Sequence, residues 1–364
     1  MIRYLITRFF QSVTVLLVMS FLIYGLIALM PGDPVDLMVA GDPNITATDA
    51  ARLRELYGTD KPILVRYKNW LLTALNGEFG FSRLYARPVL ALIGEALQNT
   101  IILLGSSFVI ALIFALPLGV LAAMWPQSRL DHSINMLAFS GISLPPFWLS
   151  LMLIIVFAVA LAWLPAGGTA ASAGSSGIFE GIRYLVLPVT SLVIASFGSH
   201  TRYMRASMVE VLQQDYIRTA RAKGLSEYGV VVTHALRNAL IPVTTMIALD
   251  FGYLFSGALI TETIFSYPGM GKLIFDSIMG NDFNLALVAL LFATALTLIC
   301  NFLADIAYAI LDKLISVLEP TAHLTRPERR AGGRGGRPLP PVGGAGEGTT
   351  NPIVDGLWSI LAPV

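Results

Sequence analysis

Charged side chains are scarce in this chain, and their scarcity excludes a soluble protein. Asp, Glu, Lys and Arg make up 13% of the 364 residues, whereas 55% are apolar. With a mean hydropathy of +0.71, most of the chain must be solvated by lipid. The 24 basic and 23 acidic residues nearly cancel, so the net charge gives no reason to expect a nucleic-acid partner.

Cysteine and catalytic motifs are also scarce. Cys300 is the single cysteine, which excludes a disulfide framework and a cysteine-based metal site within the chain. The four histidines lack the close spacing of a zinc site, and no Gly-x-Ser-x-Gly elbow occurs. The stretch from Gly269 to Lys272 is not a phosphate loop, because Ser266 and Leu273 stand where glycine and Ser or Thr are needed. We therefore expect no enzyme, no cofactor and no metal.

Long apolar stretches predict an all-α polytopic membrane protein with six transmembrane helices. A crossing helix needs about 20 mostly apolar residues. Five stretches meet this requirement clearly: 9–30, 98–124, 135–163, 241–261 and 285–311. A sixth, 185–203, is weaker because its uninterrupted apolar part is short, and on its own it also fits a re-entrant segment. It is needed to make the number of crossings even.

The distribution of basic residues predicts that both termini are cytoplasmic. Arg3 and Arg8 precede the first apolar run, which lacks a cleavage site and is therefore expected to be a retained signal anchor. The segment 204–240 carries five Lys or Arg residues that then lie inside, while the two short outside loops contain only Arg183 and Lys272. This asymmetry follows the positive-inside rule.

These assignments divide the chain into four parts. They are the cytoplasmic start with the first span (1–30), an external cap with short helices at 47–57 and 62–75 (31–97), a five-helix core (98–312) and a cytoplasmic tail (313–364). Past Pro320 the tail is rich in Gly, Pro and Arg, a composition that predicts disorder.

The cytoplasmic segment 204–240 is too structured for a simple connector. Asp215 is predicted to cap the start of a helix of about two turns, which Gly224 ends in the left-handed conformation. Ser226 is predicted to cap the next helix. The small side chains of Ala220 and Ala222 favour insertion into a groove on a cytoplasmic partner. A basic loop that only satisfies topology explains the same spacing equally well.

The residues of this loop resemble a known family. DYIRTARAKGL (215–225) followed by HALRNALIPV (234–243) is similar to the signature loop of ABC importer permeases of the oligopeptide, dipeptide and nickel branch. Of the general permease pattern only Ala220, Gly224 and Leu236 match, so the resemblance rests on the peptide-branch variant. Further similar segments follow in order over residues 1–312: PGDP (31–34), DKPILVRYKNWLLTALNGEFGFS (60–82), LQNTIILL (97–104), SLPPFWLSLMLI (143–154), FSYPGMGKL (265–273) and NFLADIAYAILD (301–312).

The resemblance implies the permease subunit of a binding-protein-dependent ABC importer in the bacterial or archaeal inner membrane. It implies a second permease subunit as heterodimer partner, cytoplasmic ABC ATPase subunits that drive transport, and an extracytoplasmic solute-binding protein. Peptides are the implied cargo, with nickel and oligosaccharides left open. It also implies that the loop couples transport to ATP hydrolysis through Asp215, Tyr216, Arg218, Thr219, Ala220, Arg221, Ala222, Lys223, Gly224, His234, Arg237 and Asn238.

Asp250 is the candidate for a residue of the translocation pathway. It lies near the middle of the fifth predicted span, where an acidic side chain costs on the order of 2.5–3.5 kcal/mol unless it faces a polar cavity or a partner. Pairing with a nearby amide or hydroxyl explains it equally well. His200 and His234 are expected in or beside the cytoplasmic loop. Asp250 also supports an alternative, a self-contained secondary transporter, although the repeated halves typical of that class are missing.

Overall fold

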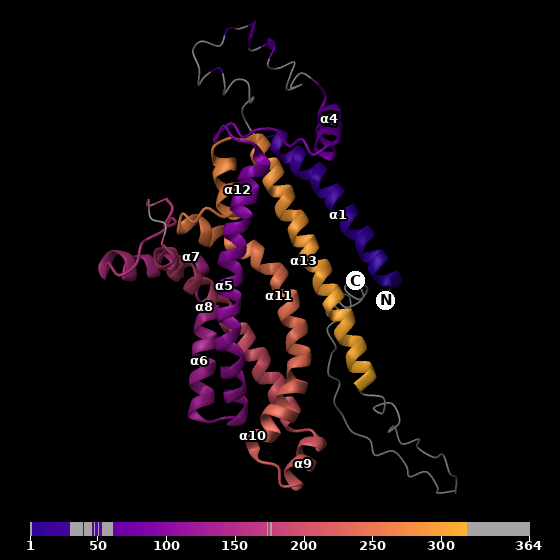
Figure 1. Ribbon diagram of the computed structural model, residues 1–364, viewed down its shortest axis with the longest axis vertical. Coiled ribbons are helices and arrows are strands. Elements are labelled where there is room, and N and C mark those ends of the chain that lie inside the picture. Colours follow the sequence, from indigo (N-terminus) through magenta and orange to yellow (C-terminus); the bar gives the residue numbers. More distant parts are fainter. Residues whose placement is uncertain are drawn as a thin grey trace, which may run out of the picture. The chain divides into compact units, whose positions relative to one another are not determined.

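The computed structural model describes residues 2–29, 61–172 and 177–318, together with positions 39, 46, 48, 49, 51, 52 and 174. Most of the predicted helix at 47–57, the PGDP segment and the tail past Leu318 lie outside these described residues. The described chain is a bundle of helices (Figure 1). The predicted all-α membrane architecture is confirmed.

Four helices of the described chain are long and apolar enough to cross a membrane. They are α1 (Ile2–Ala28), α5 (Val89–Met124), α8 (Ile178–Leu212) and α13 (Phe283–Leu318). A bent pair of helices raises the number to five if it counts as one span. The predicted stretch 241–261 lies within α11 (Leu236–Ile264), a helix of 29 residues. The described residues therefore support four to five spans by length and composition, and the prediction of six is not confirmed as a number.

The stretch 135–163, predicted as one span, is a bent pair of helices in the structure. Helix α6 (Arg129–Ser143) is followed by α7 (Pro146–Leu153) and the π-helix η1 (Ile154–Ala160), and the two halves are bent by 100°. Pro145 and Pro146 cause the break, because a proline lacks the backbone N–H and forces the residue before it out of the helical region. Leu144 is accordingly extended, and Pro146 begins α7 at a position where its missing N–H is harmless.

The weakest predicted span, 185–203, proves to be part of one of the longest helices. Helix α8 has 35 residues and contains Pro188 without a break. Its polar ends, which hydropathy alone does not assign to a span, extend the helix beyond the apolar stretch on both sides. Helix α5 likewise begins at Val89, nine residues before the predicted start at 98.

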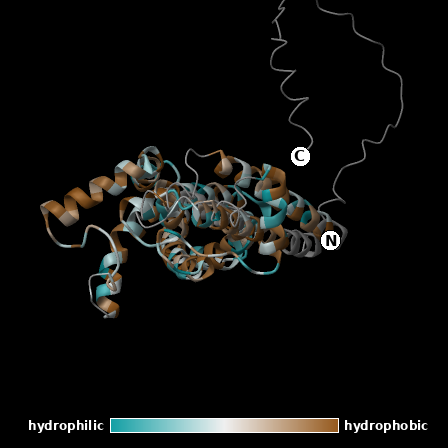
Figure 2. Cartoon of the chain, turned by 90° about the horizontal axis from the view of Figure 1, so that it is seen from above, coloured by the Kyte–Doolittle hydropathy of each residue, from teal (hydrophilic) through white to brown (hydrophobic). Residues whose placement is uncertain are grey.

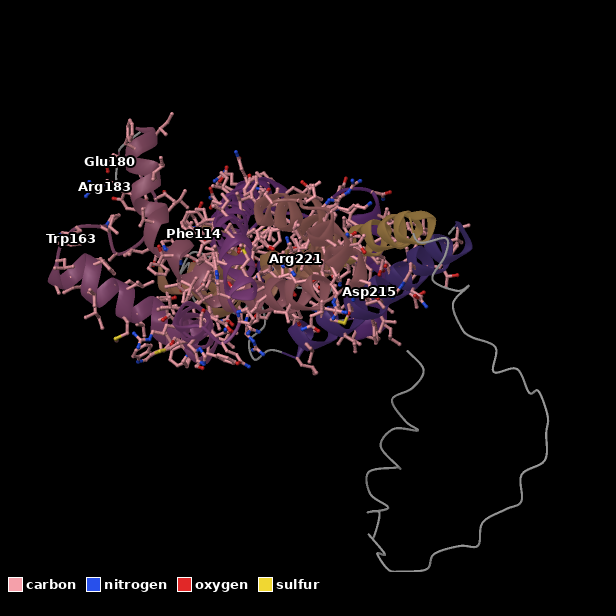
Figure 3. The ribbon with its side chains drawn as sticks, turned by 90° about the horizontal axis from the view of Figure 1, so that it is seen from below. Phe114, Trp163, Glu180, Arg183, Asp215 and Arg221 are labelled. Atoms are coloured by element: carbon pink, nitrogen blue, oxygen red, sulfur yellow. The ribbon has the colours of Figure 1, made fainter. Side chains whose placement is uncertain are left out.

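Apolar side chains cover much of the outer surface of the bundle, as expected where lipid is the solvent. Phe10, Ile113 and Val159 are each more than half exposed. Figure 2 shows hydrophobic residues along most of the helices, including the projecting segment formed by α7, η1 and the start of α8. Figure 3 labels three residues of this projecting segment. There Arg183 Nη2, near the start of α8, donates to the carbonyl oxygen of Trp163, just after η1, at 3.1 Å. This hydrogen bond joins the start of α8 to the chain that follows η1.

The short helices gather at opposite ends of the bundle (Figure 1). Helices α9 (Asp215–Ala222) and α10 (Glu227–Gly229) lie at one end, which we call the α9 end. Helices α4 (Ile63–Leu75) and α12 (Met270–Met279) lie at the other, which we call the α12 end. The long helices α5, α11 and α13 connect these two ends.

Candidate coupling loop and pathway residues

The segment between α8 and α11 forms a packed structure at the α9 end. Helix α8 continues to Leu212, and a turn at Gln213 and Gln214 leads into α9. Helix α10 then continues into the π-helix η2 (Val230–Ala235), which runs directly into α11. The loop is therefore helical over most of its length, as its sequence predicts.

A small hydrophobic core fixes α9 against the long helices. Ile217 and Ala220 of α9 are buried, with 0% and 6% exposure. They belong to one cluster of apolar side chains from α5, α8, η2 and α11: Ala123, Met204, Met208, Val230, Val231, Ala235, Ala239 and Val243. Ser207 Oγ adds a hydrogen bond of 2.8 Å to the carbonyl oxygen of Ala239. The loop thus carries its own core.

The face of α9 opposite this core is exposed. Its exposed residues are Asp215, Tyr216, Arg218, Thr219, Arg221 and Ala222, followed by Lys223. Figure 3 views the molecule from this end and labels Asp215 and Arg221. The expectation that Ala220 faces a partner is wrong, because helical geometry turns it inward beside Ile217. Ala222, two residues later, lies on the exposed face.

The predicted ends of the loop helices are largely confirmed. Gly224 has φ +82°, the left-handed conformation that ends a helix, and no atom lies within 4 Å of a Cβ added there. Ser226 Oγ accepts the Gly229 N–H at 3.3 Å and caps α10. Asp215 does not cap α9, because Gln214 is the N-cap residue and Asp215 is already helical. Its carboxylate instead lies 3.3 Å from Arg218 Nη1.

The remaining predicted loop residues lie before, within and after η2. Arg221 binds Glu227 through two hydrogen bonds of 2.9 and 3.2 Å, which join α9 to α10. His234 is half-buried in η2, and its carbonyl oxygen accepts from Asn238 Nδ2 at 2.8 Å. Arg237 and Asn238 are exposed on the first turn of α11.

A buried ion pair that the sequence did not predict joins α6 to α8 near this loop. Arg205 Nε and Nη2 donate to the two carboxylate oxygens of Asp131 at 2.6 and 2.7 Å, and Asp131 is only 3% exposed. The same carboxylate accepts from the Gln127 backbone at 2.9 Å and from Asn135 Nδ2 at 2.6 Å. A bidentate pair with its remaining lone pairs occupied is the favourable form of a buried ion pair.

Among the residues whose side chains the structure describes, the partner of Asp250 is a histidine. Asp250 Oδ2 lies 3.4 Å from His200 Nε2, and the Asp250 side chain is 31% exposed. His200 is buried within α8, so the expectation that it lies in or beside the loop is wrong. Farther along the bundle, Asp305 of α13 lies 3.3 Å from Arg8 of α1.

The α12 end is organised by a fully buried carboxylate, that of Glu262. It accepts hydrogen bonds from Thr100 Oγ1 at 2.6 Å and from the backbone N–H groups of Gly271 and Lys272 at 2.7 and 3.2 Å. A Cβ on Gly271 would lie 2.4 Å from the Leu259 Cα, so glycine is required for this close approach. The stretch that fails as a phosphate loop thus binds a carboxylate of its own chain.

A second buried carboxylate at this end, Asp282, begins α13. It accepts from Ser82 Oγ at 2.5 Å, from the Leu84 N–H at 2.9 Å and from the Leu285 N–H at 3.1 Å.

In the loop before α12, burial and secondarily the charge of Glu262 raise the pKa of Tyr267 to about 12, so this phenol stays neutral. Within the described residues, no three His, Cys, Asp or Glu side chains gather as a metal site would require.

Comparison with known proteins identifies the family. Residues 115–317 match the family described as the binding-protein-dependent transport system inner membrane component. Residues 1–99 match the N-terminal region described for the membrane component of the same transport systems. The chain belongs to this family of transport permeases.

Two curated relatives align with this chain over nearly their whole length. The permease is 40% identical over 316 residues to the oligopeptide transport system permease protein AppB of Bacillus subtilis, covering 86% of this chain and 99% of AppB. It is 36% identical over 315 residues to the glutathione transport system permease protein GsiC of Escherichia coli K12, with 86% and 99% covered. A solved inward-facing structure of the MetNI methionine ABC transporter has a TM-score of 0.51 at 16% identity, covering 62% of this chain and 98% of that one. That likeness shows the fold alone.

The predicted class of function is therefore confirmed. The chain is a membrane-spanning permease subunit of an ABC importer, a class that works in the lipid bilayer together with ATPase partners. Membership of this family sets aside the alternative of a self-contained secondary transporter.

Proposed function

We propose that this permease forms half of a translocation pathway for peptides or closely related solutes. Identity to an oligopeptide permease over almost the entire length of that relative carries the proposal. A second, different permease subunit forms the other half, and an extracytoplasmic solute-binding protein delivers the cargo. Both termini and the loop 204–240 lie in the cytoplasm.

We further propose that the exposed face of α9 is where the ATPase docks. The inward face of α9 is held by Ile217 and Ala220, so a force on the outward face is transmitted to α8 and α11 rather than absorbed by a flexible linker. The outward face presents the small side chain of Ala222 between longer polar ones, which permits a close approach. Asp250 contributes to the pathway, because its carboxylate is partly exposed within α11, the helix that contains the fifth predicted span.

Transport assays with the reconstituted transporter test the substrate. The permease, its partner permease, the ATPase subunits and the solute-binding protein are placed in proteoliposomes, and ATP hydrolysis is measured with oligopeptides, glutathione, nickel ions or oligosaccharides. We expect peptides to stimulate hydrolysis and to accumulate. Stimulation by nickel or an oligosaccharide, with none by peptides, would overturn the peptide assignment.

Two matched glutamate substitutions test the docking face. Ala222→Glu adds charge and bulk to the exposed face and keeps good helix propensity. We expect normal insertion and stability but loss of ATPase copurification. Ala220→Glu instead buries a carboxylate in the loop core and should lower the stability of the permease itself. If Ala222→Glu copurifies normally with the ATPase and supports transport, α9 is not the docking element.

Cysteine labelling tests the orientation. A cysteine at Ser226, in a chain with Cys300→Ser, should resist an impermeant reagent added outside intact cells. A cysteine at Thr48 should react. The reverse pattern would show that the loop 204–240 is external.

A further inference from the structure

Two titratable side chains face each other where α8 and α11 pack together. His200 of α8 places Nε2 3.4 Å from Oδ2 of Asp250 in α11. The His200 side chain is only 5% exposed, and its Nε2 makes no hydrogen bond in the described structure. A buried polar atom without a partner is uncommon and requires a physical explanation.

The other ring nitrogen determines the chemistry of Nε2. His200 Nδ1 lies 2.8 Å from the carbonyl oxygen of Ser196. Because a carbonyl oxygen only accepts hydrogen bonds, Nδ1 must carry a hydrogen. A neutral imidazole with its hydrogen on Nδ1 has a bare lone pair on Nε2. That lone pair would face an ionised Asp250, so two acceptors would lie 3.4 Å apart and repel each other.

A single proton removes this repulsion. On Nε2 it makes an imidazolium that attracts the carboxylate, and on Asp250 it makes a carboxyl group that donates toward Nε2. We propose that His200 and Asp250 together bind one proton, and that this proton holds α8 against α11.

The surroundings of the pair fit a proton. The described interaction partners of the two side chains are each other, the Ser196 carbonyl group of α8 and the Phe108 ring of α5, whose centroid lies 6.0 Å from that of the imidazole. None of these neighbours supplies a second charge. The Asp250 side chain is 31% exposed, whereas that of His200 is 5% exposed.

The direction of the pH effect follows from this arrangement. The contact between α8 and α11 is stabilised while the proton is bound. It weakens as rising pH removes the proton, because the two acceptors then repel. Loss of the proton therefore loosens a contact between two long helices of the permease, without any change elsewhere in the chain.

Nuclear magnetic resonance can locate the proton. The chain has four histidines, so ¹⁵N-histidine labelling of the complete transporter in lipid nanodiscs is tractable, and His200→Gln assigns the signal. At neutral pH we expect Nδ1 to be protonated, together with either Nε2 or, by infrared spectroscopy, the Asp250 carboxyl group. Asp250→Leu should remove any Nε2–H signal at this pH. A bare Nε2 beside an ionised Asp250 would overturn the proposal.

Two variants of matched shape test the link between the helices. In Asp250→Asn the amide donates to the bare Nε2 and does not titrate, whereas Asp250→Leu offers neither charge nor hydrogen bond. We expect the wild-type transporter to lose thermal stability from neutral to alkaline pH. Both variants should lack this loss, and Leu should be the less stable of the two at neutral pH. If both variants show the wild-type loss on alkalinisation, the pair does not bind the linking proton.

Discussion

The two ends of this permease are held together by different kinds of interaction. At the α9 end, the loop helices rest on a core of Ala, Val, Ile and Met side chains, with the polar residues of α9 facing outward. At the α12 end, the buried carboxylates of Glu262 and Asp282 bind backbone N–H groups and hydroxyls of several helices. Apolar packing is non-directional, whereas hydrogen bonds to a buried carboxylate fix both distance and angle.

This difference has a consequence for movement. Methionine side chains such as Met204 and Met208 adapt their shape, so α9 can shift slightly against α8 and α11 without losing its burial. Glu262 allows no such shift, because moving α12 from α5 or α11 leaves buried donors without an acceptor. We therefore expect the α12 end to be the rigid one. Three predictions probe this contrast.

The largest effect is expected at the α12 end. Glu262→Leu leaves the N–H groups of Gly271 and Lys272 and the Thr100 hydroxyl without their acceptor and should destabilise the permease by about 3–5 kcal/mol. Thermal unfolding of the purified transporter measures the loss. Glu262→Gln keeps one acceptor oxygen, so its stability should lie between those of Glu262→Leu and the wild type. A Leu variant as stable as the wild type would show that the carboxylate does not organise this end.

A smaller effect is expected at the buried ion pair near the α9 end. Arg205→Ala leaves the buried Asp131 carboxylate without its counter-charge and should destabilise by about 3 kcal/mol, partly offset by the donors Gln127 and Asn135. Arg205→Lys keeps the charge but loses the bidentate geometry. Adding Asp131→Asn to Arg205→Ala should restore part of the thermal stability. Additive losses in the double variant would show that the two residues are not coupled.

The smallest effect is expected at Gly224. Gly224→Val should cost about 1–2 kcal/mol through backbone strain alone, because an added Cβ meets no atom of the described chain within 4 Å. Gly224→Asn tolerates the left-handed conformation and should be close to wild type in a thermal unfolding experiment. Equal losses for Val and Asn would indicate that the left-handed conformation is not what requires glycine here.

The sequence by itself determined the features that depend on neighbouring residues. Apolar run length predicted the membrane helices, and local chemistry placed the left-handed Gly224 and the Ser226 cap. The ordered motifs predicted the family that the comparisons confirm. These signals act over a few residues, so no tertiary contact is needed to read them.

The tertiary structure decided everything that joins distant residues. Asp131 and Arg205 are 74 residues apart, and Thr100 and Glu262 are 162 apart, so no spacing rule pairs them. The same is true of His200 and Asp250, whose partnership appears only when α8 packs on α11. Only the structure shows that Ala222 is exposed on α9 while Ala220 is buried. A small residue on a short helix faces a partner or its own core according to which neighbours fold against it.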